Sequence, residues 1–391
     1  MSSNWNVVPF TEAVDICDTL RKPINSSERA SRIKGKEQSE LYPYYGATGQ
    51  VGFIDDYITD GEYVLLGEDG APFLDAFSKK AYIISGKTWV NNHAHVLKSK
   101  TNNKFLCYYL NSFNYKGYVS GTTRLKLTQA EMKRIPVPVP PLSEQERIVA
   151  RIEELFSQLD AGVETLKKTK AQLAVYRQAA ITEAFYVDNN TPNVCLSDIA
   201  QIIGGITKGR NLSGTETIEL PYLRVANVQN GYLDLSEIKT IKLRVDEKER
   251  YLLKPGDVLY TEGGDRDKLG RGTVWRGEIK DCVHQNHIFK ARVDQSKAIP
   301  EYVAFWSMST PARNYFYQKG KQSVNLASIN KTVLSALTLP LPALEKQREI
   351  INHIESRLSV CDSIEQTADI ALQQAEAMRQ SILKDAFEGN L

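Results

Sequence analysis

The sequence predicts an α+β chain in which two mixed, strand-rich lobes alternate with two long helices. Residues 142–185 recur at 344–387 without a gap, at an offset of 202 residues. Both copies contain no proline and carry apolar residues at alternating three- and four-residue intervals, the pattern of a long helix with a heptad seam. Short β-favouring runs bounded by Gly, Asp and Asn precede each copy. The order is therefore lobe, helix, lobe, helix, which is one unit written twice.

Composition bounds the class of protein. The chain has 391 residues, of which 42% are hydrophobic and 25% charged, as in ordinary globular proteins of two or three domains. No apolar run reaches the roughly 18 residues of a membrane span, and the first residues lack the pattern of a signal peptide. The five cysteines lie far apart without a C-x-x-C pair, which argues against a zinc site or a disulfide framework and predicts a cytoplasmic location.

Charge is divided unevenly along the chain. Residues 1–141 carry 17 Lys and Arg against 14 Asp and Glu, and residues 190–337 carry 21 against 16, so these parts hold +3 and +5. The repeats are acidic, with 6 against 8 in 142–189 and 5 against 9 in 338–391. Two basic lobes joined by acidic segments suit a polyanionic partner, although such small differences also arise from solvation alone.

The first lobe covers 1–141 and the second covers 190–341. Strands are expected at 61–66 and 81–84, and again at 202–203, 222–225, 258–260 and 287–289. Helices are expected at 103–112 and at 301–306. Weak echoes link the lobes, since Asn92-His93 in the first is matched by Asn286-His287 in the second.

Proline-rich segments lead into both helices. Residues 135–141 alternate proline with apolar residues, which forbids a helix and favours an extended entry, and 337–342 repeat the pattern. Ser143 is a plausible N-cap, followed by Glu144 and Glu146 in the first turn, where the helix dipole favours acids.

The helical segments, 142–189 and 342–391, need a partner for their apolar seams. A helix of 44 residues spans roughly 66 Å at 1.5 Å per residue and cannot bury its own stripe. The simplest partner is the other copy, in an antiparallel coiled coil with pseudo-twofold symmetry and one lobe towards each end. The expected seam is Val149, Ile152, Phe156, Leu159, Val163, Leu166, Lys170, Leu173, Arg177, Ala180 and Ala184, with Ile351, Ile354, Leu358, Cys361, Glu365, Ala368, Leu372, Ala375, Arg379, Ile382 and Ala386.

Three motifs resemble ligand-binding or metal-binding motifs, but each has a simpler interpretation. Ser85-Gly86-Lys87-Thr88 resembles the end of a phosphate-binding loop, but Ala81 stands where the first glycine is required. Residues 204–209 are glycine-rich without the dinucleotide-binding context, so we expect a loop against a DNA backbone. His93-Ala94-His95 has no third metal ligand at a sensible spacing, and a hydrogen-bonding role at a strand end is favoured.

Base reading needs bidentate donors, which are Arg or Lys for guanine and Asn or Gln for adenine. Side chains of these types recur at matching places in the two lobes and crowd the glycine loops. The alternatives are a turn that caps strand ends and plain solvated charge. The candidate DNA-binding residues are Asn91, Asn92, His93, Arg124, Lys208, Arg210, Arg266, Lys268, Arg271, Gln285, Asn286, His287, Lys319, Lys321 and Gln322.

Four polar residues recur at equivalent helix positions. Arg177 and Arg379 lie on the seam, where a charge must be paired, so they either meet acids nearby or face a partner subunit. Gln145 and Gln347 recur at the helix entries. We expect these four residues at the helix seam or in partner docking.

Several segments resemble the specificity subunits of type I restriction–modification enzymes. The resemblance rests on Pro-Pro-Leu-x-Glu-Gln at 140–145, on the ending 379–389, and on 222–231 and 89–95, and it covers essentially the whole chain. The second copy departs at Ala343 and Lys346, which replace the second proline and the glutamate of the motif.

The resemblance implies a DNA-binding protein with no catalytic residues, metal or cofactor of its own. Each lobe would be a target recognition domain that reads half of a split, asymmetric site, and the helices would set the spacer. Two modification subunits that bind S-adenosylmethionine and methylate adenine would dock on the helices. Restriction subunits that use ATP and Mg²⁺ would join them to cleave unmodified DNA.

Two other classes of protein compete with this interpretation. A structural coiled-coil adaptor would use its lobes to bind protein rather than DNA. A fused enzyme is disfavoured because the chain lacks an Asp/Asn-Pro-Pro-aromatic motif for amino-methyl transfer.

Overall fold

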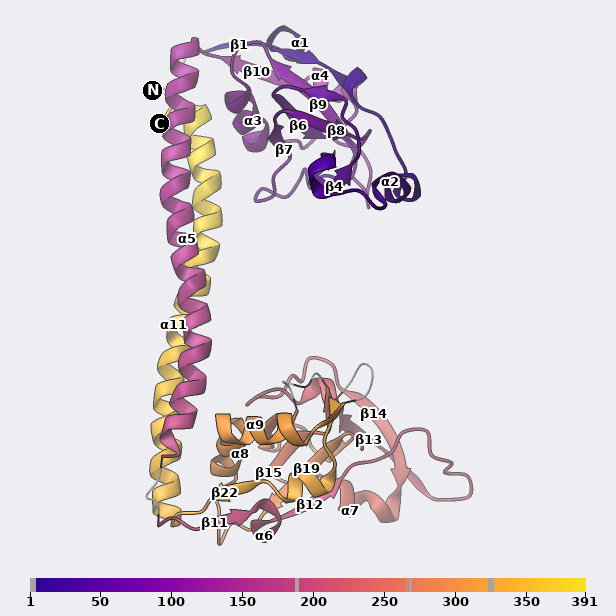
Figure 1. Ribbon diagram of the computed structural model, residues 1–391, viewed down its shortest axis with the longest axis vertical. Coiled ribbons are helices and arrows are strands. Elements are labelled where there is room, and N and C mark those ends of the chain that lie inside the picture. The colour runs from indigo at the N-terminus through magenta and orange to yellow at the C-terminus, as the bar shows by residue number, and fades with distance from the viewer. Residues whose placement is uncertain (1–4, 187–189, 265, 267–268, 323–326) are drawn as a thin grey trace. The chain divides into compact units, whose positions relative to one another are not determined.

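The computed structural model describes residues 5–186, 190–264, 266, 269–322 and 327–391, and it divides into two compact units. Unit 1 comprises Met1–Lys167 with Ala368–Leu391, and unit 2 comprises Lys168–Thr367. Each unit holds one strand-rich lobe and one stretch of both long helices (Figure 1). A helix and a lobe that follow each other in the sequence therefore do not form a unit by themselves.

The lobe of unit 1 is built on two four-stranded sheets, ordered β2-β9-β6-β7 and β4-β3-β8-β5, with a separate pair β1-β10. Its core lies between the first sheet and helices α1, α3 and α4. The strands are β1 (Asn6–Pro9), β2 (Val14–Ile16), β3 (Tyr42–Gly46), β4 (Gly49–Ile54), β5 (Thr59–Asp60), β6 (Tyr63–Gly67), β7 (Ala81–Ile84), β8 (Lys87–Val90), β9 (Ala94–Ser99) and β10 (Pro136–Val139). The helices are α1 (Phe10–Ala13), α2 (Ser26–Ile33), α3 (Asn103–Ser112) and α4 (Gln129–Lys133).

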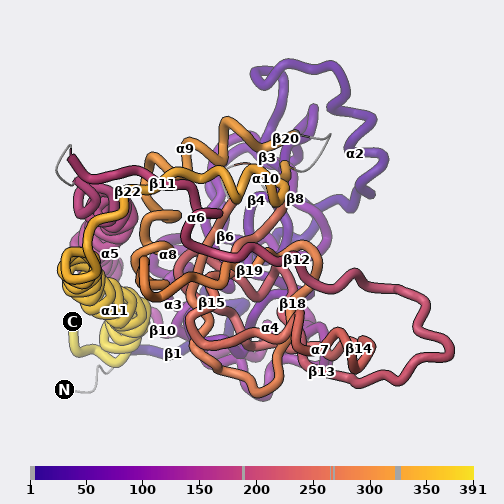
Figure 2. The backbone as a smooth tube through the Cα atoms, turned by 90° about the horizontal axis from the view of Figure 1, so that it is seen from below, coloured from indigo at the N-terminus to yellow at the C-terminus, as the bar shows by residue number. Residues whose placement is uncertain are grey.

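The lobe of unit 2 repeats this plan with sheets ordered β12-β19-β15-β17 and β14-β13-β18, and a pair β11-β22. Helix α8 lies between the first of these sheets and α11 (Figure 2). The strands are β11 (Asn193–Cys195), β12 (Ala200–Gly204), β13 (Thr217–Leu223), β14 (Lys239–Arg244), β15 (Asp257–Thr261), β16 (Gly263–Gly264), β17 (Gly272–Val274), β18 (Val283–His284), β19 (Ile288–Val293), β20 (Lys321–Gln322), β21 (Ala327–Ser328) and β22 (Thr338–Pro340). The helices are α6 (Leu196–Ile199), α7 (Lys248–Tyr251), α8 (Pro300–Met308), α9 (Thr310–Lys319) and α10 (Lys331–Ser335).

The register shows that the two lobes are copies of one fold. β3 pairs in parallel with β8 through Tyr44 and Trp89, and β13 pairs in parallel with β18 through Tyr222 and Val283. The central antiparallel pairs match as well, since Leu65 faces Val96 as Leu259 faces Lys290. The weak sequence echo therefore reflects a real structural duplication.

The elements expected from sequence are present, with small shifts of their ends. The helix expected at 103–112 is α3, which begins because the Asn102 side chain accepts a hydrogen bond from the backbone of Phe105. The strand expected at 222–225 instead ends at Leu223, and a short 3-10 turn follows it. The strands expected at 258–260 and 287–289 are β15 and β19. The strand β9 was missed, because its first four residues are all buried and show no polar–apolar alternation.

The proline-rich segments are extended, as expected, but they also pair as strands. β10 runs antiparallel to β1, and β22 runs antiparallel to β11. A two-stranded ribbon tolerates proline because each strand has an edge that needs no donor. Tyr302 and Trp306 of α8 hydrogen-bond to the Pro340 and Thr338 carbonyls at 2.8 and 2.9 Å and hold β22 against the lobe.

The long helices are α5 (Leu142–Ala184) and α11 (Leu344–Glu388). Ser143 lies inside the first turn rather than at the N-cap, because α5 already begins at Leu142. Every residue of the expected seam is buried or half-buried. The two helices run antiparallel within each unit. In unit 1 the side chains of Arg147 and Asp160 reach Leu391 and Arg379, and in unit 2 those of Arg177 and Glu183 reach Asp362 and Arg357.

A second apolar face, which the heptad pattern does not include, joins the helices to the lobes. In unit 1, Ile148 and Leu383 pack with Phe105 of α3. In unit 2, Ile181 and Ile350 occupy the same places in the core of the lobe. Each lobe is therefore packed against its own stretch of the helix pair.

Candidate nucleic-acid interface

The two lobes carry the same backbone frame where the central strand ends. In unit 1 the Glu68 amide donates to the His93 carbonyl at 2.8 Å, and the Leu127 amide donates to the Glu68 carbonyl at 2.8 Å. In unit 2 the Glu262 amide donates to the His287 carbonyl at 2.9 Å, and the Ile329 amide donates to the Glu262 carbonyl at 2.8 Å. We call this strand end the tip of a lobe, made of residues 67–70 and 91–93 in unit 1 and residues 261–264 and 285–287 in unit 2.

Three of the four DNA-binding residues expected in unit 1 line one hollow at its tip. Asn91, His93 and Arg124 line an open hollow of about 740 Å³. Arg124 Nε lies 2.7 Å from Asp69 Oδ1, and His93 Nδ1 lies 3.6 Å from Asp69 Oδ2. The Arg124 side chain is 60% exposed, so a cation anchored by its Nε stands at the mouth of the hollow.

The asparagines of this tip differ in their surroundings. Asn91 Oδ1 accepts a hydrogen bond of 2.8 Å from the His93 amide, which is the turn-capping role that we weighed as the alternative. The neighbouring Asn92 is exposed, with its side chain at the surface. Asn92 is thus the better placed of the two to meet a base.

The tip of unit 2 has the same histidine with different neighbours. His287 is exposed, and its Nδ1 lies 2.7 Å from Glu262 Oε2. Gln285 and Asn286 are half-buried beside it, and Arg271 Nη1 donates to Gln229 Oε1 at 3.0 Å. Neither Asn286 nor Gln285 reproduces the capping bond that Asn91 makes in unit 1.

The remaining candidates of unit 2 fall into two groups. Lys319 and Lys321 are exposed beside the strand pair that carries Ser328, which is in register with Gly263 of the tip. Arg266 donates to the Tyr317 carbonyl at 3.2 Å and lies over the Tyr317 ring. Lys268 lies outside the described residues, and only the backbone of Gln322 is described.

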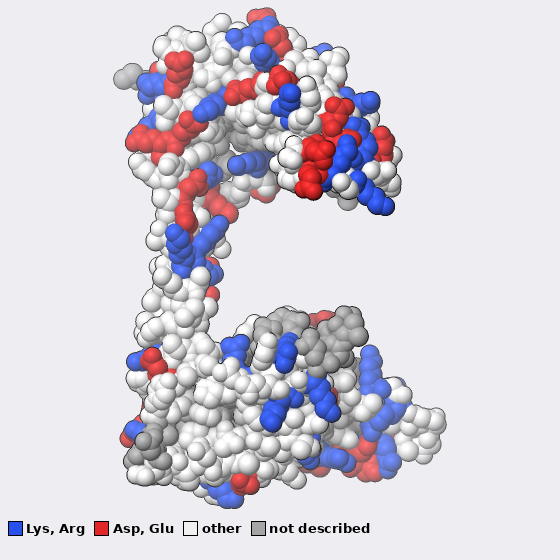
Figure 3. All heavy atoms as spheres, viewed as in Figure 1, with Lys and Arg blue, Asp and Glu red and all other residues white. Residues whose placement is uncertain are grey.

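A second basic surface lies on the sheet of β13 and β14. Arg210 forms a bidentate pair with Glu247 at 2.8 and 3.0 Å, and the hydrogen bonds from Arg210 hold the pKa of Glu247 below its usual value. Lys208 is exposed in the same loop. Basic side chains also gather over β14 (Figure 3), where the exposed residues are Lys239, Lys242 and Arg244. Arg210 is held by its acid, and Lys208 and Lys242 stand at the surface.

The glycine and histidine motifs have internal roles. A Cβ at Gly205 would lie 2.2 Å from the His284 carbonyl, so glycine is needed for two backbones to approach, and the expected loop against DNA is not what requires it. Ser85 and Gly86 form a turn between β7 and β8. His95 is fully buried and its Nδ1 lies 2.8 Å from Asp18 Oδ2, which confirms the expected hydrogen-bonding role.

The sequence pattern did not single out the acids that organise the tips. Asp18 lies outside the tip of unit 1 but holds His95, two residues beyond it. Burial alone would raise the pKa of Asp18, but hydrogen bonds from His95, Val96 and Gln129 hold this pKa below its usual value. Asp69 and Glu262 each follow the central strand by one or two residues. Extending the alignment of the two lobes from Leu65 and Leu259 pairs Glu68 with Glu262, which would have revealed Glu262. The same alignment pairs Asp69 with Gly263, so it would not have revealed Asp69.

The helix residues have specific intramolecular partners. Gln145 is 1% exposed, receives a hydrogen bond from Thr101 Oγ1 at 2.9 Å and donates to the Pro140 carbonyl at 2.9 Å. Gln347 is fully buried and is bonded to the Ile299 amide and the Lys297 and Pro342 carbonyls. These glutamines therefore fasten the start of each long helix to the lobe of its unit.

The seam arginines meet acids on the opposite helix. Arg177 lies 2.7 Å from Asp362 and 3.0 Å from Glu365, and Arg379 is paired with Asp160. Arg177 and Arg379 are equivalent under the repeat, as are Asp362 and Asp160. An equivalent cross-helix ion pair therefore occurs in both units.

Within the described ranges, no cluster of three or more His, Cys, Asp or Glu side chains is placed to hold a metal ion. No helix in the same ranges is long and apolar enough to cross a membrane.

Each lobe has a polar tip with exposed Arg or Lys side chains beside it and packs on a pair of long helices. This duplicated arrangement is that of a DNA-binding protein with two recognition lobes. Comparison with known families agrees, because residues 3–174 and 189–374 both match the model described as "Type I restriction modification DNA specificity domain". The chain belongs to this family, the specificity subunits of type I restriction–modification systems. It is therefore a DNA-recognition subunit of such a system, in which specificity subunits are the non-catalytic part.

Individual relatives support the assignment over nearly the whole chain. A putative type I restriction enzyme specificity subunit of Haemophilus influenzae, S.HindORF215P, is 26% identical over 384 residues, covering 94% of this chain and 91% of that protein. The EcoKI specificity subunit of Escherichia coli K12 is 26% identical over 311 residues, covering 73% and 65%.

Solved structures share the fold. A chain from a study entitled "Structural basis underlying complex assembly and conformational transition of the type I R-M system" has a TM-score of 0.70 at 17% identity, covering 100% of this chain and 99% of that one. The HsdS subunit of Thermoanaerobacter tengcongensis has a TM-score of 0.54 at 16% identity, covering 100% and 98%.

Proposed function

We propose that each lobe reads its half of the DNA site through its tip. The observation that carries this proposal is the shared strand-end frame with different polar side chains: Asp69, His93 and Arg124 in unit 1, and Glu262, His287 and Arg271 in unit 2. A common frame with varied donors suits two lobes that read different half-sites. Guanidinium groups match guanine, and carboxylates accept from the cytosine amino group.

The long helices, in this proposal, set the distance between the half-sites and bind two modification subunits. Those subunits bind S-adenosylmethionine and methylate adenine, and restriction subunits that use ATP and Mg²⁺ join them. A paired helix suits a spacer because it is stiffer than a flexible linker. The exposed apolar residues Val175, Val360 and Met378 on the helices suit protein contacts.

Replacing Arg124 tests the role of the tip. In the complex with modification subunits, Arg124→Ala should weaken binding of the cognate duplex about 10- to 100-fold and relax specificity at one position, if Arg124 reads a base. If it contacts phosphate, binding should weaken on all duplexes and the slope of log K against log salt should fall by about 0.9. The matched control is Arg134→Ala, which removes another exposed arginine that is paired with an acid, Glu131. Unchanged affinity and unchanged salt slope for Arg124→Ala would remove the tip from the interface.

Deleting one heptad from both helices at paired positions tests the spacer. Seven residues shorten a helix by roughly 10 Å, which is about three base pairs. The spacing in the methylated DNA motif should shrink accordingly, as sequencing of methylated adenine would show. A stable complex that keeps its original spacing would mean that the helices do not measure the site.

A further inference from the structure

In unit 2, the helix α9 of the lobe fills the space between the lobe and the helix pair. α9 follows α8 directly, and its first turn lies against α5. Gln178 Nε2 donates to the Met308 carbonyl at 2.8 Å and Gln178 Oε1 accepts from Arg313 at 2.7 Å. Thr182 and Thr310 bring their hydroxyl oxygens within 3.0 Å.

Among its described residues, unit 1 has no equivalent of α9. After α3 the chain runs through 113–119 to Ser120, which bridges Lys126 as Lys321 pairs with Ser328 in unit 2. The corresponding segment of unit 2, 309–320, is longer and contains α9. Tyr115 is fully buried against Phe73, with ring centroids 5.0 Å apart, but no described residue of unit 1 takes the place of the first turn of α9.

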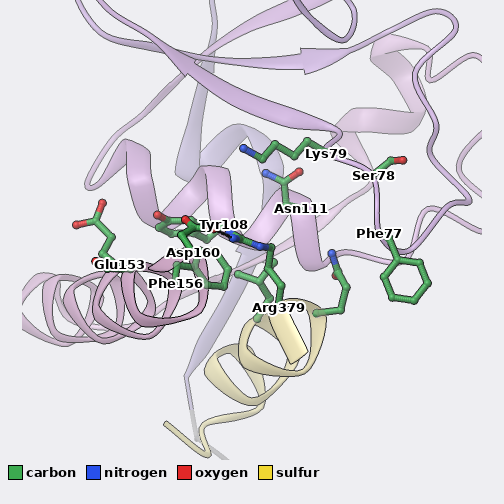
Figure 4. Close-up of a pocket in the computed structure, with 12 residues that line it drawn as sticks. Phe77, Ser78, Lys79, Tyr108, Asn111, Glu153, Phe156, Asp160 and Arg379 are labelled. Atoms are coloured by element: carbon green, nitrogen blue, oxygen red, sulfur yellow. Dashed lines mark hydrogen bonds and ion pairs between the residues drawn. The ribbon is translucent and has the colours of Figure 1, made fainter. Parts of the chain in front are cut away.

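The vacant place is a pocket of about 490 Å³ (Figure 4). The loop residues Phe77 and Lys79 stand on one side, and Arg379 with Asp160 and Phe156 stands on the other. The wall also includes Gln380, which is the equivalent of Gln178 under the 202-residue repeat. Within the described part of the chain, the side chain of Gln380 makes no hydrogen bond.

We propose that this pocket accepts the first turn of an α-helix from a partner subunit, which supplies in trans what α9 supplies within unit 2. The inference rests on the proposed function, in which modification subunits bind the helix pair, and it adds that the two halves of the chain bind them unequally. The partner helix makes a contact in unit 1 that α9 excludes in unit 2.

The pocket defines the chemistry of the occupant. Its acids, Glu153 and Asp160, are already paired with Lys104 and Arg379. The acceptor that the pocket offers to a cation is therefore the amide oxygen of Gln380, as the amide oxygen of Gln178 accepts from Arg313 in unit 2. Tyr108 and Phe156 form an aromatic floor, with ring centroids 5.8 Å apart, and Phe77 is 56% exposed at the rim. The occupant is therefore a helix start with a small or apolar residue, followed about one turn later by arginine or lysine.

Titration of the purified modification subunit onto the full chain tests the proposal. The double substitution Phe77→Ser with Gln380→Ala should weaken one of the two binding steps about tenfold and leave the other unchanged. Ser157→Trp, which fills the pocket from α5, should do the same without removing a contact residue. The matched control is Leu74→Ser, because Leu74 is 58% exposed on the same loop but does not line the pocket.

The outcomes separate this proposal from the function on which it rests. If both binding steps are unchanged, the pocket does not bind the partner helix, while subunit binding and duplex recognition remain intact. Equal weakening of both steps would also overturn it, because a pocket in unit 1 cannot act at unit 2. If the wild-type chain binds no modification subunit, the proposed function fails together with the pocket.

Discussion

The equivalent strands of the two lobes share a backbone but differ in what they bury. Val90 and Val96 of unit 1 correspond to His284 and Lys290 of unit 2, and all four are fully buried. His284 donates through Nδ1 to the Ile288 carbonyl at 2.9 Å, and Lys290 donates to the Leu252 carbonyl at 2.7 Å. Burial lowers the pKa of His284 to about 3 and that of Lys290 to about 8.

This difference shows that backbone pairing sets the arrangement of the strands, which does not require an apolar side chain at every buried position. A buried ionisable group is tolerated where a backbone carbonyl meets it. Its cost appears as a dependence of stability on pH, because the folded and unfolded states hold different numbers of protons. Unit 2 should therefore be the pH-sensitive half of the chain.

Substitutions in the helix seam should have the largest effect on the free energy of unfolding, and they should destabilise both units equally. Ile152 and Ile354 are equivalent under the repeat and both are fully buried between the helices and the lobes. Ile152→Ala or Ile354→Ala should each lower the free energy of unfolding by about 2–5 kcal/mol, through lost apolar contact and the cavity left behind. Denaturant unfolding measures the change, and Val175→Ala, at a position 71% exposed, is the control. A loss in only one unit would show that the two halves do not depend on the seam alike.

Acid should destabilise unit 2 through His284. Its folded pKa of about 3 lies below the ordinary value of 6.5, so the unfolded state binds the proton first. The contribution of neutral His284 is complete above pH 6.5 and is lost as the pH falls towards 3. The variant His284→Val, which carries the residue of unit 1, should flatten this part of the stability profile by on the order of 2–4 kcal/mol.

Thermal unfolding between pH 7 and pH 4 checks the expectation. Val90→Ala, at the equivalent place in unit 1, should lower stability by the same amount at every pH. A variant His284→Val with the acid sensitivity of the wild type would assign that sensitivity to other groups.

The cross-helix arginines should show the smallest difference between the units. Arg177→Ala breaks an exposed pair with Asp362 and Glu365, and should lower the free energy of unfolding by about 0.2–1 kcal/mol. Arg379→Ala should cost up to about 1 kcal/mol more, because Arg379 also lies over the Phe156 ring at 4.4 Å. Repeating the measurement at high salt separates the contributions, since screening weakens the ion pairs more than the stacking. If Arg177→Ala and Arg379→Ala lower the free energy of unfolding by the same amount at every salt concentration, the ring contact contributes nothing.

The sequence by itself determined the duplication, the two helices and the position of each seam residue. It could do so because heptad spacing is a local pattern and an exact 202-residue offset needs no structure to be read. It also placed α3 correctly, because the apolar spacing of Phe105, Leu106 and Tyr109 is local as well. Family motifs then pointed to DNA recognition.

Only the tertiary structure decided which side chains share a tip. Asp69 and His93 lie far apart in the sequence and meet because β6 and β9 pair at the centre of a sheet. Arg124 joins them because the chain around Lys126 bridges to Asp69. The same holds for Gln145, whose partner Thr101 is fixed by the packing of the lobe on the helix. Long-range strand pairing and helix packing depend on the whole chain, and a reading of local pattern does not contain them.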